Sequence, residues 1–506
     1  MKTHPNLVVN GLVTLALVSA GCAVGPAYRQ PSIGAPPAFK EPPPVNLEEA
    51  AAAGWKQSQP GDAYAKGRWW ELYNDPALNA LEEQVNVSNQ NVLQAEALYR
   101  QARAAVGVAR SPLFPSVTTA PAITASGGAT NGNDATNAPG NASVTGNSSG
   151  ASRSTSFTLP SSVSWEPDLW GSVRRGVTAS VATAESLAAK VGNARLLFQA
   201  ELAQDYFGLH GLDGEVELLA RTEASYREYL TLTQNRFAGG IASDLDVAQA
   251  EAQLYTVQAQ LIDLGVQRAA FEHAIAILIG KAPAELSIPP ATLTVSPPPV
   301  PLGVPSELLE RRPDIAAAER QVAAANEQIG IAMAAFYPNL NLTGNAGLAS
   351  SSLANWLTWP SRFWSVGPQL AATLFDAGRR RGVVAEQRAA YDATVAAYRQ
   401  TVLTAMQQVE DNLAALRILA GEADKVQQTV RAATRALDIS SAQYRAGTAS
   451  YLTVITSQAT LLNANVTAVT LLVRRLTASV LLIEALGGGW NASQFPTEQN
   501  ANAPQR

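Results

Sequence analysis

The chain has 506 residues and carries 36 basic against 41 acidic residues, a formal net charge of −5. Charged residues make up 15% of it, well below the ~25% of typical soluble domains, and no basic block occurs, which argues against a nucleic-acid partner. A single cysteine excludes an internal disulfide and any Cys-rich metal site, and the three histidines are far apart. We therefore expect no enzyme, no cofactor and no metal centre.

The start of the chain is typical of a secretory signal. Lys2 precedes the apolar run 7–20, which is too short for a membrane span of ~20 residues, and Gly21-Cys22 follows. This arrangement resembles a bacterial lipoprotein signal, so we predict a signal peptide over 1–21 and Cys22 as the lipid-attachment residue. The alternative is an ordinary secretory signal with an incidental cysteine. The Pro/Ala-rich stretch 22–67 is predicted to be an extended, lipid-anchored linker.

The remainder of the chain is an internal duplication. The motif 236–245 recurs at 443–452, an offset of 452 − 245 = 207, and 171–280 aligns with 378–487 without a gap. Self-similarity at one fixed offset shows that the chain contains two copies of one unit. We predict a first repeat at 68–281, a Pro-rich linker at 282–305, a second repeat at 306–489 and a C-terminal tail at 490–506.

Long helices dominate each repeat. Asp75-Pro76 is a helix start, and heptad spacing predicts one continuous helix from there to Ser111-Pro112. Residues 176–236 and 382–443 each read as helix for about 60 residues, or ~90 Å. Such a length suits a structure that crosses the periplasm.

The helix after Leu245, like its duplicate after Leu452, carries two apolar seams on opposite faces. Such a helix packs between two neighbouring helices, and a ring of helices packed in this way forms a tube. The alternative is a helix in the middle of a soluble bundle. In the first repeat, one seam contains Leu245, Ala252, Ala259, Val266, Ala248, Tyr255, Ile262 and Ala269, and the other Leu254, Leu261, Ile275, Val257, Leu264, Phe271 and Leu278.

Between the helices, two β-hairpins are predicted at 116–165 and 339–375. Their strands, of about ten residues each, alternate weakly in polarity, as outer-membrane strands do, although Pro121 and Pro160 are unusual inside strands. Four strands leave open edges in lipid, so the chain must oligomerise, with 8 strands as a dimer or 12 as a trimer. No other run of 18 apolar residues is present, which excludes a helical membrane transporter. The strands are 116–126, 154–165, 339–348 and 362–375, with Trp165, Trp170, Trp356, Trp359 and Trp364 in or beside them.

Several motifs together resemble the outer-membrane efflux proteins, which are TolC-like, and most closely their NodT-type lipoprotein branch. The resemblance implies a mainly α fold with transmembrane β: a trimeric 12-stranded barrel, a long coiled-coil α-barrel and a mixed α/β collar. It implies a passive exit duct in the Gram-negative outer membrane, lipid-anchored and extending into the periplasm. Its partners would be a periplasmic adaptor, an inner-membrane transporter and outer-membrane lipid. The motifs are Gly21–Pro26, Trp69–Pro76, Arg311–Ile315 and Phe375–Gly378.

The resemblance also implies sites. The turns 238–242 and 445–449 would be periplasmic tips that contact the adaptor through Gly239, Gly240, Ala446 and Gly447, although glycine also simply caps helices. Past the second tip, Leu452 and Tyr444 would form the periplasmic gate, with Asp244 and Asp246 supplying charge from the first repeat. Thr456 and Ala459 stand where relatives carry a charged lock.

Some other motifs are read as structural. Arg312-Pro313-Asp314 is interpreted as part of the collar, and Glu410-Asp411 as a solvated helix face. The alternatives to a drug-efflux duct are the outer-membrane component of a type I protein-secretion system and a periplasmic coiled-coil scaffold lipoprotein. A surface enzyme is a third class, but no nucleophile–base or metal constellation is visible.

Overall fold

The computed structural model describes residues 23–34, 36, 38–41, 67–128, 152–298 and 311–490. These residues form two compact units, each of which combines parts of both repeats. A β unit contains the described residues within Met1–Arg29, Ala104–Val181 and Ala323–Asp392. A helical unit contains those within Gln30–Arg103, Ala182–Val322 and Ala393–Arg506.

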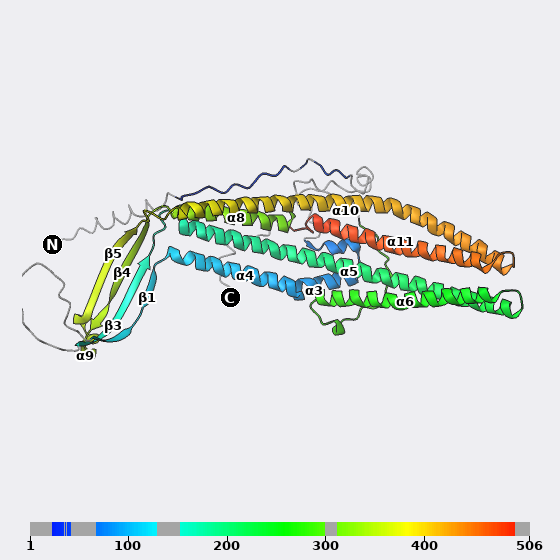
Figure 1. The fold of residues 1–506 in the computed structure, drawn as a ribbon, viewed down its shortest axis with the longest axis horizontal. Coiled ribbons are helices and arrows are strands. Elements are labelled where there is room, and N and C mark those ends of the chain that lie inside the picture. The colour runs from blue at the N-terminus through cyan, green and yellow to red at the C-terminus, as the bar shows by residue number, and fades with distance from the viewer. Residues whose placement is uncertain are drawn as a thin grey trace, which may run out of the picture. The chain divides into compact units, whose positions relative to one another are not determined.

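The β unit is built on one antiparallel sheet with the strand order β1-β3-β4-β5, in which β2 also pairs with β3 (Figure 1). Two strand pairs predicted from the sequence are therefore joined edge to edge through β3 and β4. The strands are β1 (Ser116–Thr119), β2 (Ala122–Gly128), β3 (Ser152–Trp165), β4 (Asn339–Ser350) and β5 (Arg362–Ala371).

The predicted strand 116–126 is split into β1 and β2, and β5 ends at Ala371 instead of residue 375. Pro121 lies between β1 and β2, where a proline has no N–H for the ladder, yet both strands keep one register on β3. Pro160 lies inside β3 opposite Gly347. A Cβ at Gly347 would lie 2.3 Å from the Leu159 carbonyl oxygen, so glycine allows the close approach there.

The register sorts the side chains of the sheet by chemistry. Directly paired residues share a face, and so do alternate residues along one strand. One face is predominantly apolar, with Val117, Ile123, Phe157, Leu159, Val163, Trp165, Leu340, Leu342, Leu348, Trp364, Val366, Pro368 and Leu370. The other is predominantly small and polar apart from Phe363, with Ser116, Thr118, Thr124, Ser126, Ser154, Ser156, Thr158, Ser162, Ser164, Asn339, Asn341, Thr343, Asn345, Ser365 and Gln369.

Helices make up most of the rest of the described chain, and the bounds of the long ones repeat. The helices α5 and α10 each have 67 residues, α6 and α11 each have 35, and each pair is offset by 207 residues (379 − 172 = 207). The helices are α3 (Pro76–Ser88), α4 (Gln90–Arg110), α5 (Ser172–Ala238), α6 (Asp244–Leu278), α8 (Pro313–Ala334), α9 (Leu353–Trp356), α10 (Arg379–Arg445) and α11 (Tyr451–Ala485).

The duplication extends to individual contacts. Gly280, with φ +70°, packs so tightly on the Ser88 backbone that a Cβ would lie 2.2 Å from its carbonyl oxygen. Its duplicate Gly487, with φ +96°, packs in the same way on Arg311, at 2.1 Å. Both positions therefore require glycine for conformation and for space.

The predicted single helix from Asp75 to Ser111 is wrong, because it breaks at Asn89 into α3 and α4. Asn89 is extended, and its side-chain oxygen accepts hydrogen bonds from the N–H groups of Asn91 and Val92, as an N-cap does. Its amide donates to the Leu278 carbonyl at 2.8 Å. This contact 189 residues away does not appear in a local heptad pattern.

Within the helical unit, small residues let α6 and α11 both approach α5. A Cβ at Gly208 would meet the ring of Phe271 from α6, and a Cβ at Gly211 would lie 2.4 Å from Val473 of α11. In α11 the packing covers much of both predicted seams. In α6 only the seam with Leu254 and Val257 is buried; the other is exposed in this chain. That exposed seam (called the α6 outer face below) includes Leu245, Tyr255, Ile262 and Val266.

Among the described helices, only α11 is long and apolar enough to cross a membrane by length and composition. It nevertheless packs against other helices of its unit, through Tyr451, Val454 and Ile455. It also carries Arg474 and Arg475. We therefore assign it to the helical unit and not to a membrane span.

Candidate functional site

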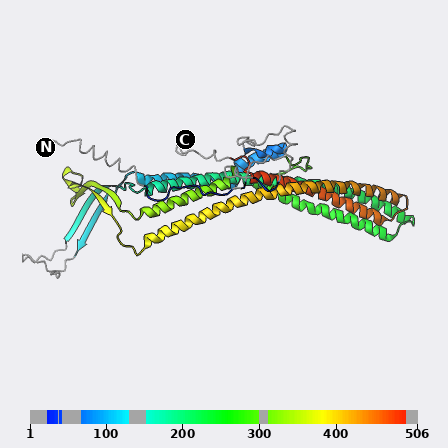
Figure 2. The ribbon, with the colours of Figure 1, turned by 90° about the horizontal axis from the view of Figure 1, so that it is seen from above.

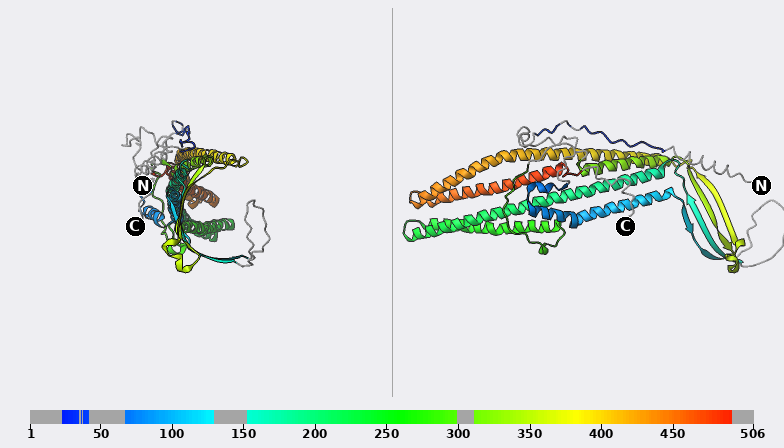
Figure 3. Two further views of the ribbon diagram at one scale, coloured as in Figure 1. Left: turned by 90° about the vertical axis from the view of Figure 1, so that its left-hand side faces the viewer. Right: turned by 180° about the vertical axis from the view of Figure 1, so that it is seen from behind.

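Two helical hairpins, α5–α6 and α10–α11, each end in a turn (Figures 2 and 3). The two turns have the same backbone geometry. In the first, Gly240 has φ +72°; its N–H bonds the Phe237 carbonyl, and Ile241 N–H bonds that of Arg236. In the second, Gly447 has φ +78°, and it and the next residue, Thr448, make the equivalent bonds. Both are Schellman caps, so the glycines have the structural role considered in the sequence.

The predicted adaptor-contacting residues Gly239, Gly240, Ala446 and Gly447 all lie in these exposed turns. Their neighbours differ between the hairpins. Ile241, in the first turn, has 73% of its surface exposed, whereas Thr448 occupies the equivalent position in the second. The two turns therefore share a backbone shape but present different chemistry.

The predicted gate residues occupy different environments. Leu452, in the first turn of α11, is 54% exposed. Tyr444 is 5% exposed, its hydroxyl lies 3.1 Å from the Thr233 hydroxyl, and its ring packs 5.5 Å from that of Tyr451. Within one chain, Tyr444 is therefore buried against residues of both hairpins, whereas Leu452 is exposed.

The two predicted acidic gate residues, Asp244 and Asp246, differ in their hydrogen bonds. Asp246 completes a capping box: its carboxylate accepts from the Ser243 N–H at 2.9 Å, and Ser243 Oγ accepts from the Asp246 N–H at 3.3 Å. Asp244 is exposed. Asp246 is therefore committed to starting α6, and Asp244 is the carboxylate that remains at this surface.

A contact between the hairpins was missed from the sequence. Arg236 of α5 donates to the Tyr444 carbonyl at 2.6 Å, and its guanidinium lies 4.5 Å from the centre of the Tyr444 ring. Tyr229 donates to Ser441 at 2.6 Å nearby, and burial raises the pKa of the neighbouring Tyr451 hydroxyl. Arg236 is the first residue of the duplicated motif 236–245, but the residue that it binds, Tyr444, belongs to the second repeat.

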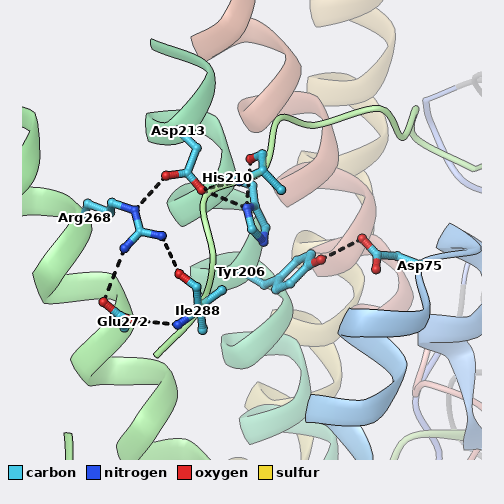
Figure 4. Close-up of polar contacts among 8 residues, drawn as sticks. Asp75, Tyr206, His210, Asp213, Arg268, Glu272 and Ile288 are labelled. Atoms are coloured by element: carbon cyan, nitrogen blue, oxygen red, sulfur yellow. Dashed lines mark hydrogen bonds and ion pairs between the residues drawn. The ribbon is translucent and has the colours of Figure 1, made fainter. Parts of the chain in front are cut away.

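Nearer the middle of α5, around His210 and Asp213, an ion-pair network binds the segment that joins the two repeats (Figure 4). Asp213 accepts from Arg268 of α6 at 2.7 Å and from the backbone N–H of Ala291 at 3.0 Å. His210 Nδ1 lies 3.0 Å from Asp213 Oδ2 and 2.9 Å from the Ala291 carbonyl oxygen; since both are acceptors, this nitrogen carries the proton.

The same network also binds the backbone of the segment between the repeats at Ile288. Arg268 donates to the Ile288 carbonyl at 2.7 Å, and the Ile288 N–H donates to Glu272 at 2.6 Å (Figure 4). Charged side chains thus satisfy backbone groups in a stretch that has no ladder of its own. The described part of the predicted linker 282–305 is therefore fixed to the helices.

The N-terminal segment is held in a comparable way. Predicted Cys22 and the signal peptide lie outside the described residues, but Glu41 pairs with Arg417 of α10 at 2.7 Å. Glu410 accepts from the backbone N–H groups of Lys40 and Glu41 at 2.6 and 2.9 Å. The interpretation of Glu410 as a merely solvated residue is therefore wrong, because it binds the backbone of this N-terminal segment (the described residues within 23–41, called the strap below).

The motif Arg312-Pro313-Asp314, at the start of α8, makes contacts within the helical unit. Arg312 makes a two-point ion pair with Asp314 and donates to the carbonyl of Ala485, the last residue of α11. Burial raises the pKa of nearby Glu484 to about 7, although Arg312 opposes the shift. This region therefore contains an acid that titrates near neutral pH.

A sequence model of the family described as outer membrane efflux protein matches residues 81–281 and 304–488. The chain belongs to the outer membrane efflux protein family. A probable efflux pump outer membrane protein of Pseudomonas putida, TtgC, is 30% identical over 493 residues, 97% of each chain. The outer membrane protein OprJ of Pseudomonas aeruginosa is 29% identical and covers 94% of this chain and 95% of its own length.

Solved structures agree with this assignment. The outer-membrane channel OprN has a TM-score of 0.81 at 28% identity, covering 93% of this chain and all of its own. The outer membrane protein VceC of Vibrio cholerae has a TM-score of 0.74 at 27% identity, covering 83% of this chain and 98% of its own. The family consists of outer-membrane efflux channels, not enzymes, which confirms the predicted Gram-negative outer-membrane location and efflux-duct function.

Proposed function

We propose that three copies of this chain close one 12-stranded barrel and form the passive exit duct of a tripartite pump. The sorting of the sheet into an apolar and a polar face carries this proposal. Trp364, Val366 and Leu370 alternate along β5 and are 76%, 79% and 69% exposed. Apolar side chains exposed on one face, opposite serine, threonine and asparagine, suit a wall between lipid and an aqueous lumen.

Open surfaces of the single chain support oligomerisation. Among the described residues, β5 pairs only with β4, while β1 and β2 pair only with β3, so both sheet edges are unpaired. Unpaired edges are unfavourable in a bilayer, where closure removes them. The α6 outer face also leaves Ile262 and Val266 77% and 69% exposed, and a neighbouring subunit would cover it.

The two hairpin tips would meet the periplasmic adaptor, and Leu452 would form the gate. Three symmetry-related copies of an exposed leucine make an apolar ring, which excludes water. Tyr444 would support that ring from behind, and Asp244 is the acid left to add charge. An inner-membrane transporter would drive the cargo.

Lipidation of Cys22 would add an anchor. The strap that follows is fixed to α10 through Glu41 and Glu410, so the acyl chains would be tethered at a defined place. Mass spectrometry of the mature N-terminus should show an acylated cysteine. An unmodified N-terminus at another residue would contradict this part of the proposal.

Small, toxic or antimicrobial molecules are the proposed cargo. Relatives 30% identical to this chain are named for toluene efflux, antibiotic efflux and pyoverdine export. The proposal is tested by deleting the gene and restoring either wild type or a variant lacking 339–371. Wild type should restore resistance to antibiotics and solvents. Unchanged resistance on deletion, together with loss of a secreted protein, would indicate the protein-secretion alternative.

A further inference from the structure

A groove of about 720 Å³ lies in the β unit between the end of α8 and the start of α10. Its apolar lining includes Val24, Met333, Phe336 and Val384, and Arg381 and Arg388 also line it. Its size is within the range of ligand sites, and its lining combines apolar surface with a few charges. The groove is therefore suited to an amphiphile with an acidic group.

The two arginines are available for a ligand. Arg381 and Arg388 are exposed, lie seven residues apart on one side of α10, and have no hydrogen-bond or ion-pair partner among the described residues. Their neighbour Arg380 is engaged, because it pairs with Asp376 at 2.6 Å and lies over the Phe336 ring. Asp392 is the one acid in the lining, so the groove has a net charge of +1.

The position of the groove adds an independent argument. Tyr337 stacks on Trp170 with 4.6 Å between ring centres, and Trp170 donates to the Pro338 carbonyl at 2.8 Å, directly before β4 begins. Tryptophan and tyrosine are enriched where a membrane meets water. Val24, two residues after the predicted lipid-bearing cysteine, bonds the Trp170 carbonyl through its N–H at 3.1 Å. Both features are typical of a site close to the interface between a membrane and water.

We propose that this groove binds one anionic glycerophospholipid of the periplasmic leaflet. Its phosphodiester would lie between Arg381 and Arg388, and one acyl chain would lie along Met333, Phe336 and Val384. Arginine is well suited to phosphate because its planar fork donates several hydrogen bonds. An acyl chain alone would leave both guanidinium groups without a partner, so the lipid headgroup explains the whole lining. The inference rests on the proposed membrane span of the strands.

Native mass spectrometry of the purified, full-length protein tests this site, using phosphatidylglycerol and phosphatidylethanolamine at matched concentrations. We expect wild type to retain phosphatidylglycerol preferentially, and the double variant R381Q/R388Q to bind it on the order of 30-fold more weakly. The matched control is R379Q/R399Q, which removes the same charge from α10 at two exposed arginines outside the lining. The control should bind the lipid as wild type does.

A photo-crosslinking residue in place of Ala385, which also lines the groove, identifies the occupant directly. Crosslinks to phospholipid support the site. Crosslinks to acyl chains carried by the protein's own Cys22 or to another subunit, with none to phospholipid, overturn it, as does equal retention of both lipids by wild type and R381Q/R388Q. Conductance of the same preparation is measured separately, so a duct that conducts but retains no lipid refutes the site alone, and a protein that never conducts refutes the proposed function.

Discussion

The two repeats have the same helix lengths and the same turn geometry, yet they differ in what surrounds them. Val473 of α11 packs into the space left by Gly211, whereas its counterpart Val266 on α6 is 69% exposed. Phe237, at the first tip, is 47% exposed, whereas its counterpart Tyr444 is buried. Duplication has therefore preserved the backbone, while the burial of side chains at these equivalent positions differs.

The contacts that hold irregular segments of the helical unit show the same divergence. In the first repeat, Arg268 and His210 hold the segment between the repeats. At the position equivalent to His210, the second repeat has Arg417, which instead holds Glu41 of the N-terminal strap. Each repeat thus holds a different segment of chain through the side chain at the position shared by His210 and Arg417. The same substitution made at equivalent positions of the two repeats should therefore have different effects on folding, trimer assembly, gating and adaptor binding.

The largest contrast is expected for glutamate at the paired valines. Val473→Glu places a carboxylate against Gly211 and should lower the free energy of unfolding by about 2–4 kcal/mol. Val266→Glu should leave the unfolding of the chain nearly unchanged but prevent trimer formation. Thermal unfolding and light scattering in detergent measure the two effects. Equal destabilisation by both substitutions would contradict the proposed difference between the repeats.

The gate is tested by serine at Leu452 and at its counterpart Leu245. Both leucines are exposed, at 54% and 64%, but only Leu452 is proposed to line the constriction. Leu452→Ser should wet the ring, raise single-channel conductance several-fold and sensitise cells to large antibiotics. Leu245→Ser is the matched control and should conduct as wild type. A lower melting temperature with unchanged conductance in Leu452→Ser would remove that residue from the gate.

Exchange of the tip residues tests docking. Ile241→Thr removes an exposed apolar side chain and should weaken adaptor binding about tenfold, since burying such a side chain contributes ~1.5–3 kcal/mol. The reciprocal Thr448→Ile adds apolar surface at the second tip and should not weaken binding. Surface plasmon resonance with the purified adaptor provides the comparison. Identical affinities for wild type and Ile241→Thr would show that the tips bind through backbone shape alone.

The smallest effect is expected from Glu484, whose counterpart in the first repeat is Ile277. Because burial raises the pKa of the folded-state carboxyl to about 7, the folded chain holds a proton that the unfolded chain loses from about pH 4.5 upward. Stability should therefore fall as pH rises from about 4.5 to 7, and Glu484→Gln should reduce that fall by about 1–2 kcal/mol. Melting temperatures across pH 4.5–8 test this; an unchanged slope in the variant would contradict it.

Local patterns predicted much of the fold. The duplication, the long helices and the strand positions follow from periodicity and glycine placement, and α5 and α10 begin and end within a few residues of prediction. The break at Asn89 was missed because its stabilising partner, the Leu278 carbonyl, is distant in sequence. The seams of α6 were predicted, but which seam is covered depends on glycines in α5.

The candidate site was less predictable. The glycines of the duplicated motif predicted both turns. In the structure Gly240 and Gly447 have positive φ, a conformation that few other residues adopt. The bond from Arg236 to the Tyr444 carbonyl and the anchoring of the strap by Glu410 depend on tertiary contacts between charged groups and backbone. Such contacts have no sequence period. The burial of Tyr444 likewise follows from the other hairpin, which supplies Thr233 and Tyr229.

Crosslinking of the two sheet edges is the most direct test of the central claim that separate copies complete this sheet. Cysteines replace both Ile123 on β2 and Val366 on β5 in a background where Cys22 is serine, and this double-cysteine chain is expressed and oxidised in outer-membrane vesicles. Using the double-cysteine chain, we predict a ladder of crosslinked species that ends at three subunits, because β5 of each copy pairs with β1 and β2 of the next. Crosslinks confined to single chains, or a ladder that ends at two or extends past three, would contradict the account.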